Sequence, residues 1–182
     1  MAELIEFTYA QLSLAAYAEF NKYAPLEALV KAGFSLAQAE QFVATYRILD
    51  HQPNTTGSGF SATVFQRIGD ENSRILAIRG TEPTPTDLIS DISIGLFGTV
   101  VLQPQYAALT DYLRDLRNLG IISATQNFSV TGHSLGGYLK EKRGQLLFRR
   151  GAGSSSWAER GLQAQGAAIF VCQVPARTIV NG

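Results

Sequence analysis

A G-x-S-x-G pentapeptide, GHSLG at residues 132–136, constrains this chain more than any other stretch. The β-branched and aromatic run before it, NFSVT at 127–131, predicts a strand that enters a tight strand-to-helix turn. A serine on such a strained turn needs neighbours without side chains two positions away on each side, and glycines occupy both positions. We therefore predict that Ser134 is a nucleophile at a sheet edge. A glycine-rich turn without a catalytic role is the alternative that the pentapeptide alone leaves open.

The residues before this motif predict an α/β fold with a helical N-terminus. Helices are expected over residues 3–20, 25–32 and 36–46. Pro25 opens the second helix and Gly33 ends it, and Ser35 caps the third. Alternating or β-branched runs predict strands over residues 47–50, 60–65 and 74–78. We expect the last two to form a hairpin or an adjacent pair.

A helix is expected over residues 105–120, where apolar residues share one face and Gly120 is a C-terminal stop. It lies between the strand at 74–78 and the strand that enters the pentapeptide. Strand, helix, strand, with a motif at the carboxyl end of the second strand, is the pattern of an α/β crossover. We therefore expect the two strands to be part of one sheet.

The chain changes character after residue 139. Residues 1–139 carry 8 Lys and Arg against 13 Asp and Glu, whereas residues 140–182 carry 7 against 2. The stretch KEKRG at 140–144 is a poor continuation of a helix that should bury itself under a sheet. We interpret 1–139 as the organised part and 140–182 as an atypical basic, Gly/Arg-rich tail of unrelated sequence. Within this tail, 151–156 is typical of a linker and 167–174 predicts a strand of uncertain partner.

Composition excludes several classes of function. The formal charge is zero, so there is no electrostatic basis for nucleic-acid binding. Cys172 is the single cysteine and there are two histidines, which makes a Cys- or His-based metal site improbable. No apolar run approaches 18 residues, so no integral membrane segment is expected. With no signal peptide apparent, we expect a soluble protein, cytoplasmic by default, and secretion without a signal peptide is compatible with the sequence.

Two motifs together resemble the class 3 (fungal-type) lipases of the α/β-hydrolase fold. They are RGT at 79–81, at the end of one predicted strand, and GHSLGG at 132–137, at the end of the next. The resemblance covers residues 40–139 and implies a partial α/β-hydrolase-type sheet, truncated after the nucleophile elbow. It also implies hydrolysis of carboxylic esters such as acylglycerols, with no cofactor and with a lipid or small ester as substrate.

The resemblance assigns roles to four residues. Ser134 matches the nucleophile of the family, and Leu135 and Thr81 match the two residues whose backbone N–H groups hold the oxyanion. Asp91 corresponds to the aspartate that orients the Thr81 hydroxyl, with one residue more in the loop. Physical chemistry requires the same arrangement, because two N–H groups from separate strand ends must converge on one carbonyl oxygen.

Alternative interpretations stay open at this point. Thr81 can be an ordinary strand-end residue, and Asp91 can be a capping or solvated carboxylate. The apolar segment 94–102 resembles a lid that contacts a lipid interface transiently, but buried packing explains it equally well. The same elbow also fits a thioesterase or a peptidase.

The departure from the family concerns the catalytic triad. In this fold the acid and the histidine follow the serine, yet no Asp and no His occur after residue 134. Glu141 and Glu159 are the only acidic candidates there, and His51 precedes both motifs. Three explanations compete: a truncated or frame-disrupted copy of a longer lipase, the first part of an enzyme completed by another chain, and a catalytically silent pseudoenzyme with a lipid-binding pocket.

Overall fold

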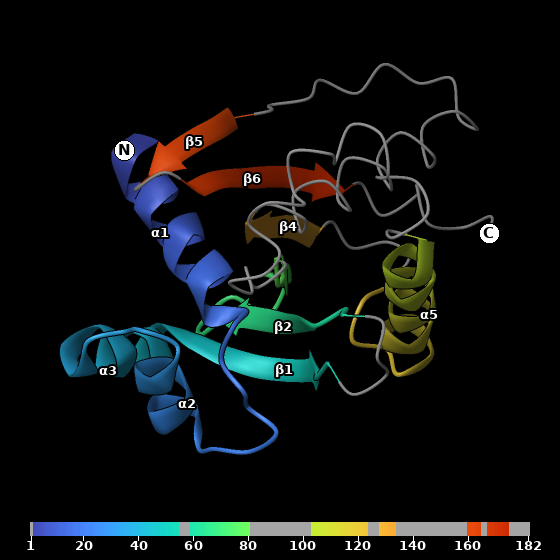
Figure 1. The fold of residues 1–182 in the computed structure, drawn as a ribbon, viewed down its shortest axis with the longest axis horizontal. Helices are drawn as coiled ribbons and strands as arrows, with labels where there is room; N and C mark the ends of the chain where they lie inside the picture. The colour runs from blue at the N-terminus through green and yellow to red at the C-terminus, as the bar shows by residue number, and fades with distance from the viewer. Residues whose placement is uncertain are drawn as a thin grey trace, which may run out of the picture.

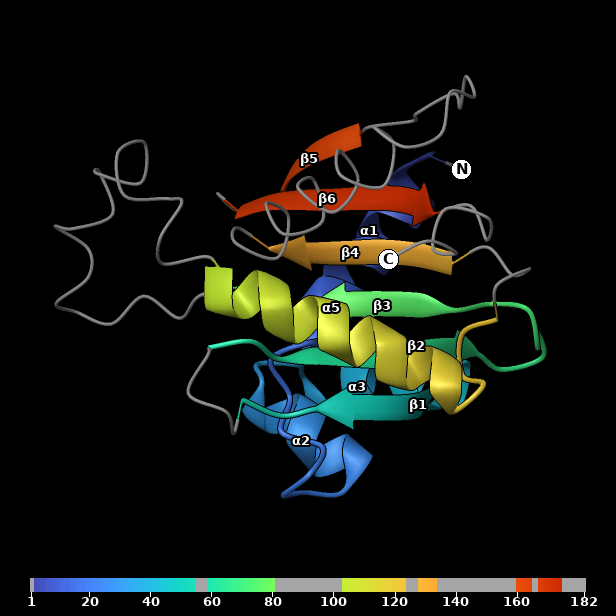
Figure 2. The same cartoon turned by 90° about the vertical axis from the view of Figure 1, so that its right-hand side faces the viewer.

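The computed structural model describes residues 2–54, 59–80, 103–123, 128–133, 160–164 and 167–174. These residues form three layers, with one mixed sheet between two layers of helices. Helices α1, α2 and α3 lie on one side of the sheet and α5 crosses the other side (Figures 1 and 2). The expected α/β organisation with a helical N-terminus is therefore confirmed for the described residues.

The three N-terminal helices follow the sequence signals closely. They are α1 (Ala2–Ala15), α2 (Pro25–Lys31) and α3 (Leu36–Thr45). Pro25 occupies the first turn of α2, and Ser35 forms a capping box with Gln38 at the start of α3. Helix α1 ends five residues earlier than expected, because the N–H groups of Tyr17 and Ala18 bond the carbonyls three residues back and tighten the chain out of the helix.

The first three strands form an antiparallel meander: β1 (Tyr46–Gln52), β2 (Ala62–Arg67) and β3 (Ile75–Ile78). The turn between β2 and β3 places Gly69 at a φ of 84°, a conformation that glycine adopts without strain. Because β1 and β3 both run against β2, they share one direction. Their carboxyl ends therefore lie at the same edge of the sheet.

Helix α5 (Gln103–Asn118) separates β3 from β4 (Phe128–His133) in the sequence, and the two strands pair in parallel. Gly120, at a φ of 71°, follows the helix as the sequence predicted. The expected crossover is confirmed, because α5 lies against the face opposite α1 (Figure 2).

The sheet continues past β4, which differs from the truncation that we expected. Strand β6 (Ala167–Val174) pairs antiparallel with β4, and β5 (Arg160–Ala164) pairs with β6, giving the order β1-β2-β3-β4-β6-β5. The strand predicted at 167–174 is confirmed, and its partner is now known. If β4 were an edge strand, backbone N–H and C=O groups on one of its sides would lack hydrogen-bond partners. Pairing with β6 provides these partners.

Apolar side chains form one cluster on each face of the sheet. Under α5 the cluster includes Leu109, Leu113 and Leu116, which are almost fully buried against the strands. On the other face the cluster joins Leu12, Leu29 and other residues of the N-terminal helices to Phe65 and Ala77. Both faces are therefore covered, as a sheet with a parallel pair requires.

Two hydroxyl contacts join α1 to β4. The buried side chains of Ser13 and Thr131 lie 2.6 Å apart, oxygen to oxygen, and the Tyr9 hydroxyl donates to Ser129 at 3.3 Å. In a buried site such hydroxyls need partners, because an unpaired polar group keeps its desolvation cost. The pair therefore fixes α1 over the strand that leads to Ser134.

We expect Thr131→Val to lower the free energy of unfolding by about 1–3 kcal/mol, because it leaves the buried Ser13 hydroxyl without its partner. The double variant Ser13→Ala/Thr131→Val should cost clearly less than the sum of the two single variants, since both polar groups are then removed. Urea unfolding would measure all three, with Thr45→Val, on a partly exposed threonine, as the control. Additive effects would contradict a direct Ser13–Thr131 interaction.

Candidate active-site edge of the sheet

The parallel pair β3 and β4 brings the two predicted motifs to one edge. Ile78 pairs with Gly132, and Ala77 pairs with Thr131. From these pairs the chain continues through Arg79 and Gly80 on one strand and through His133 on the other. The residues that directly precede Thr81 and Ser134 are therefore neighbours at the carboxyl edge of the sheet.

The four predicted site residues lie outside the residues that the structure describes. This holds for Thr81, Asp91, Ser134 and Leu135, and also for the segment 94–102 and for Glu141 and Glu159. Their roles stay predictions, and what the structure contributes is the position of the strand ends that precede them.

His51 lies far from the end of β4. It forms one row across the sheet with Thr63, Ala77 and Thr131, so three strand spacings separate it from β4. At about 4.8 Å per spacing, this is about 14 Å. His51 is therefore no neighbour of the strand that leads to Ser134.

The surroundings of His51 disfavour its charged form. Its Nδ1 lies 2.8 Å from the Thr63 hydroxyl oxygen, and its ring meets Phe20 edge-on at 5.5 Å between centroids. Burial lowers the pKa of His51, and the nearby Arg79 guanidinium lowers it further, whereas Asp50 and Glu19 oppose the shift. The imidazole is thus held mainly neutral near pH 7.

Arg79, the first residue of the RGT motif, is positioned by both backbone and side chain. Its N–H donates to the Ser61 carbonyl at 3.0 Å, which extends the β2–β3 pairing, and its guanidinium carbon lies 5.6 Å from the Tyr17 ring centroid. The Ser61 hydroxyl donates to the Gln52 carbonyl at 3.0 Å. These contacts hold the ends of β1, β2 and β3 together at the candidate edge.

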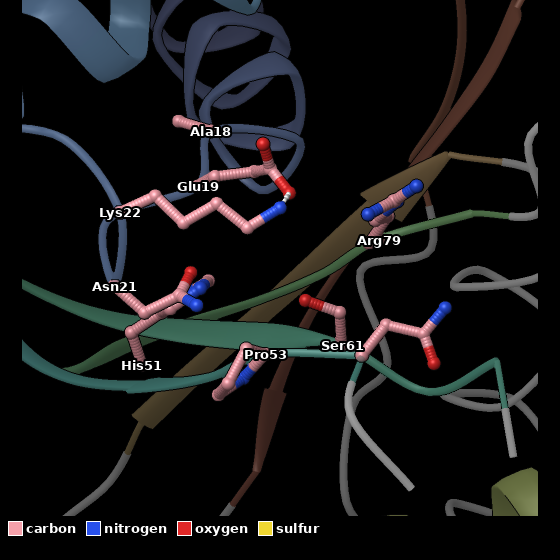
Figure 3. Close-up of a pocket in the computed structure, with 9 residues that line it drawn as sticks. Ala18, Glu19, Asn21, Lys22, His51, Pro53, Ser61 and Arg79 are labelled. Atoms are coloured by element: carbon pink, nitrogen blue, oxygen red, sulfur yellow. Dashed lines mark hydrogen bonds and ion pairs between the residues drawn. The ribbon is translucent and has the colours of Figure 1, made fainter. Parts of the chain in front are cut away.

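A polar cavity of about 260 Å³ lies at this edge (Figure 3). It is bounded by the segment after α1 and by the ends of β1 and β3, and the described residues that line it are Ala18, Glu19, Asn21, Lys22, His51, Pro53, Asn54, Ser61 and Arg79. Sequence reasoning gave no role to any of them beyond the RGT motif that contains Arg79. The segment around Glu19 and Lys22 has no motif that places it beside a strand 60 residues later.

A larger cavity, of about 670 Å³, lies at the opposite edge. It is bounded by the starts of β3 and β4, including Arg74, Ile75, Phe128 and Ser129, and by α1. Thr81 and Ser134 follow the carboxyl ends of these strands, whereas this larger cavity lies at their amino ends. It is therefore not at the edge where we expect Thr81 and Ser134 to act.

The described ranges contain neither a cluster of metal ligands nor a membrane-spanning helix. Nowhere in them do three His, Cys, Asp or Glu side chains gather in a way that could hold a metal ion. Of the helices described, none has the length and apolar character needed to span a membrane.

We expect His51→Asn to reduce the dependence of stability on pH. A histidine whose pKa is lowered by folding binds fewer protons in the folded state, so its contribution to stability is full above pH 6.5, the ordinary value, and is lost as the pH falls below it. Unfolding midpoints from pH 7.5 to 5 should therefore fall less steeply in the variant. An identical slope in both proteins would contradict a lowered pKa.

Comparison with known proteins identifies the family. Residues 8–166 match the family model of the phospholipase-like group described as the Tle-like phospholipase domain. No curated protein and no solved structure matches the chain. The match indicates a lipid-hydrolysing function and a lipase- or phospholipase-like family, without pointing to the class 3 lipases in particular. Since it covers most of the 182 residues, the chain belongs to the family of Tle-like phospholipase domains.

Proposed function

We propose that this chain carries the nucleophile and the oxyanion-binding groups of a serine hydrolase that acts on a carboxylic ester of a glycerolipid. The observation that carries the proposal is the parallel pairing of β3 and β4, with Ile78 opposite Gly132. In this register Thr81 follows Ile78 by three residues, and Ser134 follows Gly132 by two.

The spacing of the strands suits an oxyanion hole. Neighbouring strands lie about 4.8 Å apart, so donors that follow two adjacent strand ends can reach one oxygen between them. In the proposed arrangement the backbone N–H groups of Thr81 and Leu135 bind that oxygen, and Asp91 orients the Thr81 hydroxyl. The α/β-hydrolase type of sheet is part of this proposal.

The proposed reaction transfers an acyl group and then hydrolyses it. The Ser134 oxygen attacks the ester carbonyl carbon, and the bond from that carbon to the alcohol oxygen breaks. The hydroxyl proton leaves with the alcohol, and water later adds to the acyl-serine to release the carboxylic acid and restore the hydroxyl. No cofactor takes part in either step.

The general base is the missing element of this proposal. No histidine follows Ser134 within these 182 residues, and His51 lies three strands from β4. Without a base the serine is a poor nucleophile, and the remaining acceleration over water is about 10³–10⁴. We propose that these residues alone are an incomplete hydrolase, with a silent lipid-binding protein as the alternative.

Two lines of support bear on the substrate. The family is named for phospholipases, whereas RGT and GHSLGG resemble the class 3 lipases, whose substrates are acylglycerols. Both substrates present a carboxylic ester on glycerol. We therefore propose a glycerolipid ester, with transient contact of segment 94–102 at the lipid interface.

A short p-nitrophenyl ester should give a burst of at most one nitrophenol per chain, followed by very slow turnover. Ser134→Ala should abolish the burst, because it removes the attacking oxygen, whereas Ser73→Ala, at a partly exposed position between β2 and β3, should keep it. Stopped-flow absorbance would measure both phases. Fast sustained turnover would contradict the claim that these residues lack a general base. A fluorophosphonate probe that fails to label Ser134 would contradict the claim that Ser134 lies on a preorganised nucleophile elbow.

Asp91→Ala and Thr81→Ala should each slow acylation by up to about 100-fold, since Thr81→Ala removes the hydroxyl at the oxyanion site and Asp91→Ala removes the carboxylate that orients it. The double variant should be no slower than either single variant, because Asp91 acts only through Thr81. Asp87→Ala, in the same segment, is the matched control and should leave the rate unchanged. Additive losses in the burst-phase rate would contradict the assigned role of Asp91.

A further inference from the structure

Helix α1 follows the parallel pair of β3 and β4 in regular steps. The Tyr9 hydroxyl donates to the Ser129 hydroxyl at 3.3 Å. Four residues later in the helix and two later in the strand, the oxygens of the buried Ser13 and Thr131 lie 2.6 Å apart. Four helical residues advance about 6.0 Å and two strand residues about 6.6 Å, so the contacts stay in step. Helix α1 therefore runs in the same direction as β4, towards the carboxyl edge.

The next contact at this spacing is made with β3. Tyr17, in the turn after α1, follows Ser13 by four residues, and its ring centroid lies 5.6 Å from the guanidinium carbon of Arg79. Arg79 follows Ala77, the strand partner of Thr131, by two residues. Helix α1 and the turn after it therefore contact both strands of the parallel pair.

The two contacted strand residues come shortly before the predicted site residues. Thr131 precedes Ser134 by three residues, and Arg79 precedes Thr81 by two. Among the described residues, the β3–β4 ladder ends one residue before Arg79, whose own N–H donates to β2. The contact with Tyr17 therefore restrains the end of β3 beyond the point where the ladder joins it to β4.

We propose that Ser13 and Tyr17 are positioning residues, through which α1 aligns the end of β3 with the end of β4. This role rests on the proposed function, because the groups to be aligned are the backbone N–H of Thr81 and the hydroxyl of Ser134. Both positioning residues act through the strand residues that they contact. A displacement of about 1 Å at a catalytic group can slow a reaction about 100-fold, so a small shift of one strand end against the other would matter.

The kinetic test uses the whole 182-residue chain and the burst phase with a p-nitrophenyl ester, at a temperature where circular dichroism shows each variant to be folded. Ser13→Ala and Tyr17→Leu should each slow acylation about 10-fold, because each loosens one strand end. The ester concentration that gives half the maximal rate should stay unchanged, because alignment and not binding is impaired. Tyr17→Phe should restore the rate, because it keeps the ring beside Arg79.

A hydrogen bond on the other face of the sheet provides a matched control. The largely buried Tyr112 hydroxyl donates to Asp50 at 2.7 Å and so joins α5 to β1. Strand β1 is three places from β4 in the sheet. Tyr112→Phe therefore removes a helix-to-strand hydrogen bond away from the β3–β4 edge. It should lower the free energy of unfolding and leave the acylation rate unchanged.

A spectroscopic readout tests the alignment without any catalysis. Ser13 contacts β4, whereas Gly80 follows Arg79 at the end of β3. Ser13→Ala should move the backbone amide NMR signals of both Gly132 and Gly80, because α1 connects the two strand ends. Tyr112→Phe should leave both signals in place. The Gly80 signal is the decisive one, since it lies on the strand that Thr131 does not belong to.

The outcomes separate the positioning role from the proposed hydrolase activity. Full acylation rates in Ser13→Ala and Tyr17→Leu, or an equal loss in Tyr112→Phe, would overturn the positioning role. A stationary Gly80 signal, or a Tyr17→Phe variant as slow as Tyr17→Leu, would also overturn it. If Ser13→Ala fails to fold, the two Tyr17 variants decide, because Tyr17 is partly exposed. If the unchanged protein never forms an acyl-serine, the hydrolase proposal fails, and the Gly80 signal alone then decides whether α1 aligns the strand ends.

Discussion

The parallel pairing of β3 with β4 is the constraint on which the rest of the structure depends. A parallel pair needs a connection that leaves the sheet and returns, and α5 lies within that connection and covers one face. The other face is then covered by the N-terminal helices. Since β1 runs in the same direction as β3, one edge collects the carboxyl ends of three strands, where ligands of open α/β sheets generally bind.

Two polar contacts set the positions of helices that the apolar clusters hold against the sheet. The buried Ser13–Thr131 pair joins α1 to β4, and on the opposite face the Tyr112 hydroxyl donates to Asp50 at 2.7 Å, joining α5 to β1. Apolar contact is not directional, so neither cluster alone would set the exact position of a helix along a strand. These hydrogen bonds select one position and thereby hold the carboxyl edge in place.

The candidate edge has two features that bear on function, namely the neighbouring ends of β3 and β4 and the polar cavity beside them. The ends of β3 and β4 directly precede the two motifs, and the family match indicates a lipid-hydrolysing function. Beside them, the cavity between the segment after α1 and the ends of β1 and β3 is lined by polar and charged side chains, including His51, whose pKa is lowered by burial. Arg79 is common to the two regions, because it lines the cavity and lies two residues before Thr81.

Local signals in the sequence determined most of the elements. Pro25, Ser35 and Gly120 marked helix boundaries correctly, and runs of β-branched, aromatic or other apolar residues indicated β4 and β6 as strands. The two motifs also pointed to a lipase- or phospholipase-like family, although not to the Tle-like group in particular. Only the tertiary structure decided that β6 pairs with β4, that β5 extends the sheet, and that Glu19, Lys22, His51 and Arg79 share one cavity. The physical reason is that capping and periodicity depend on neighbours in the chain, whereas strand partners and cavities depend on contacts between residues far apart in it.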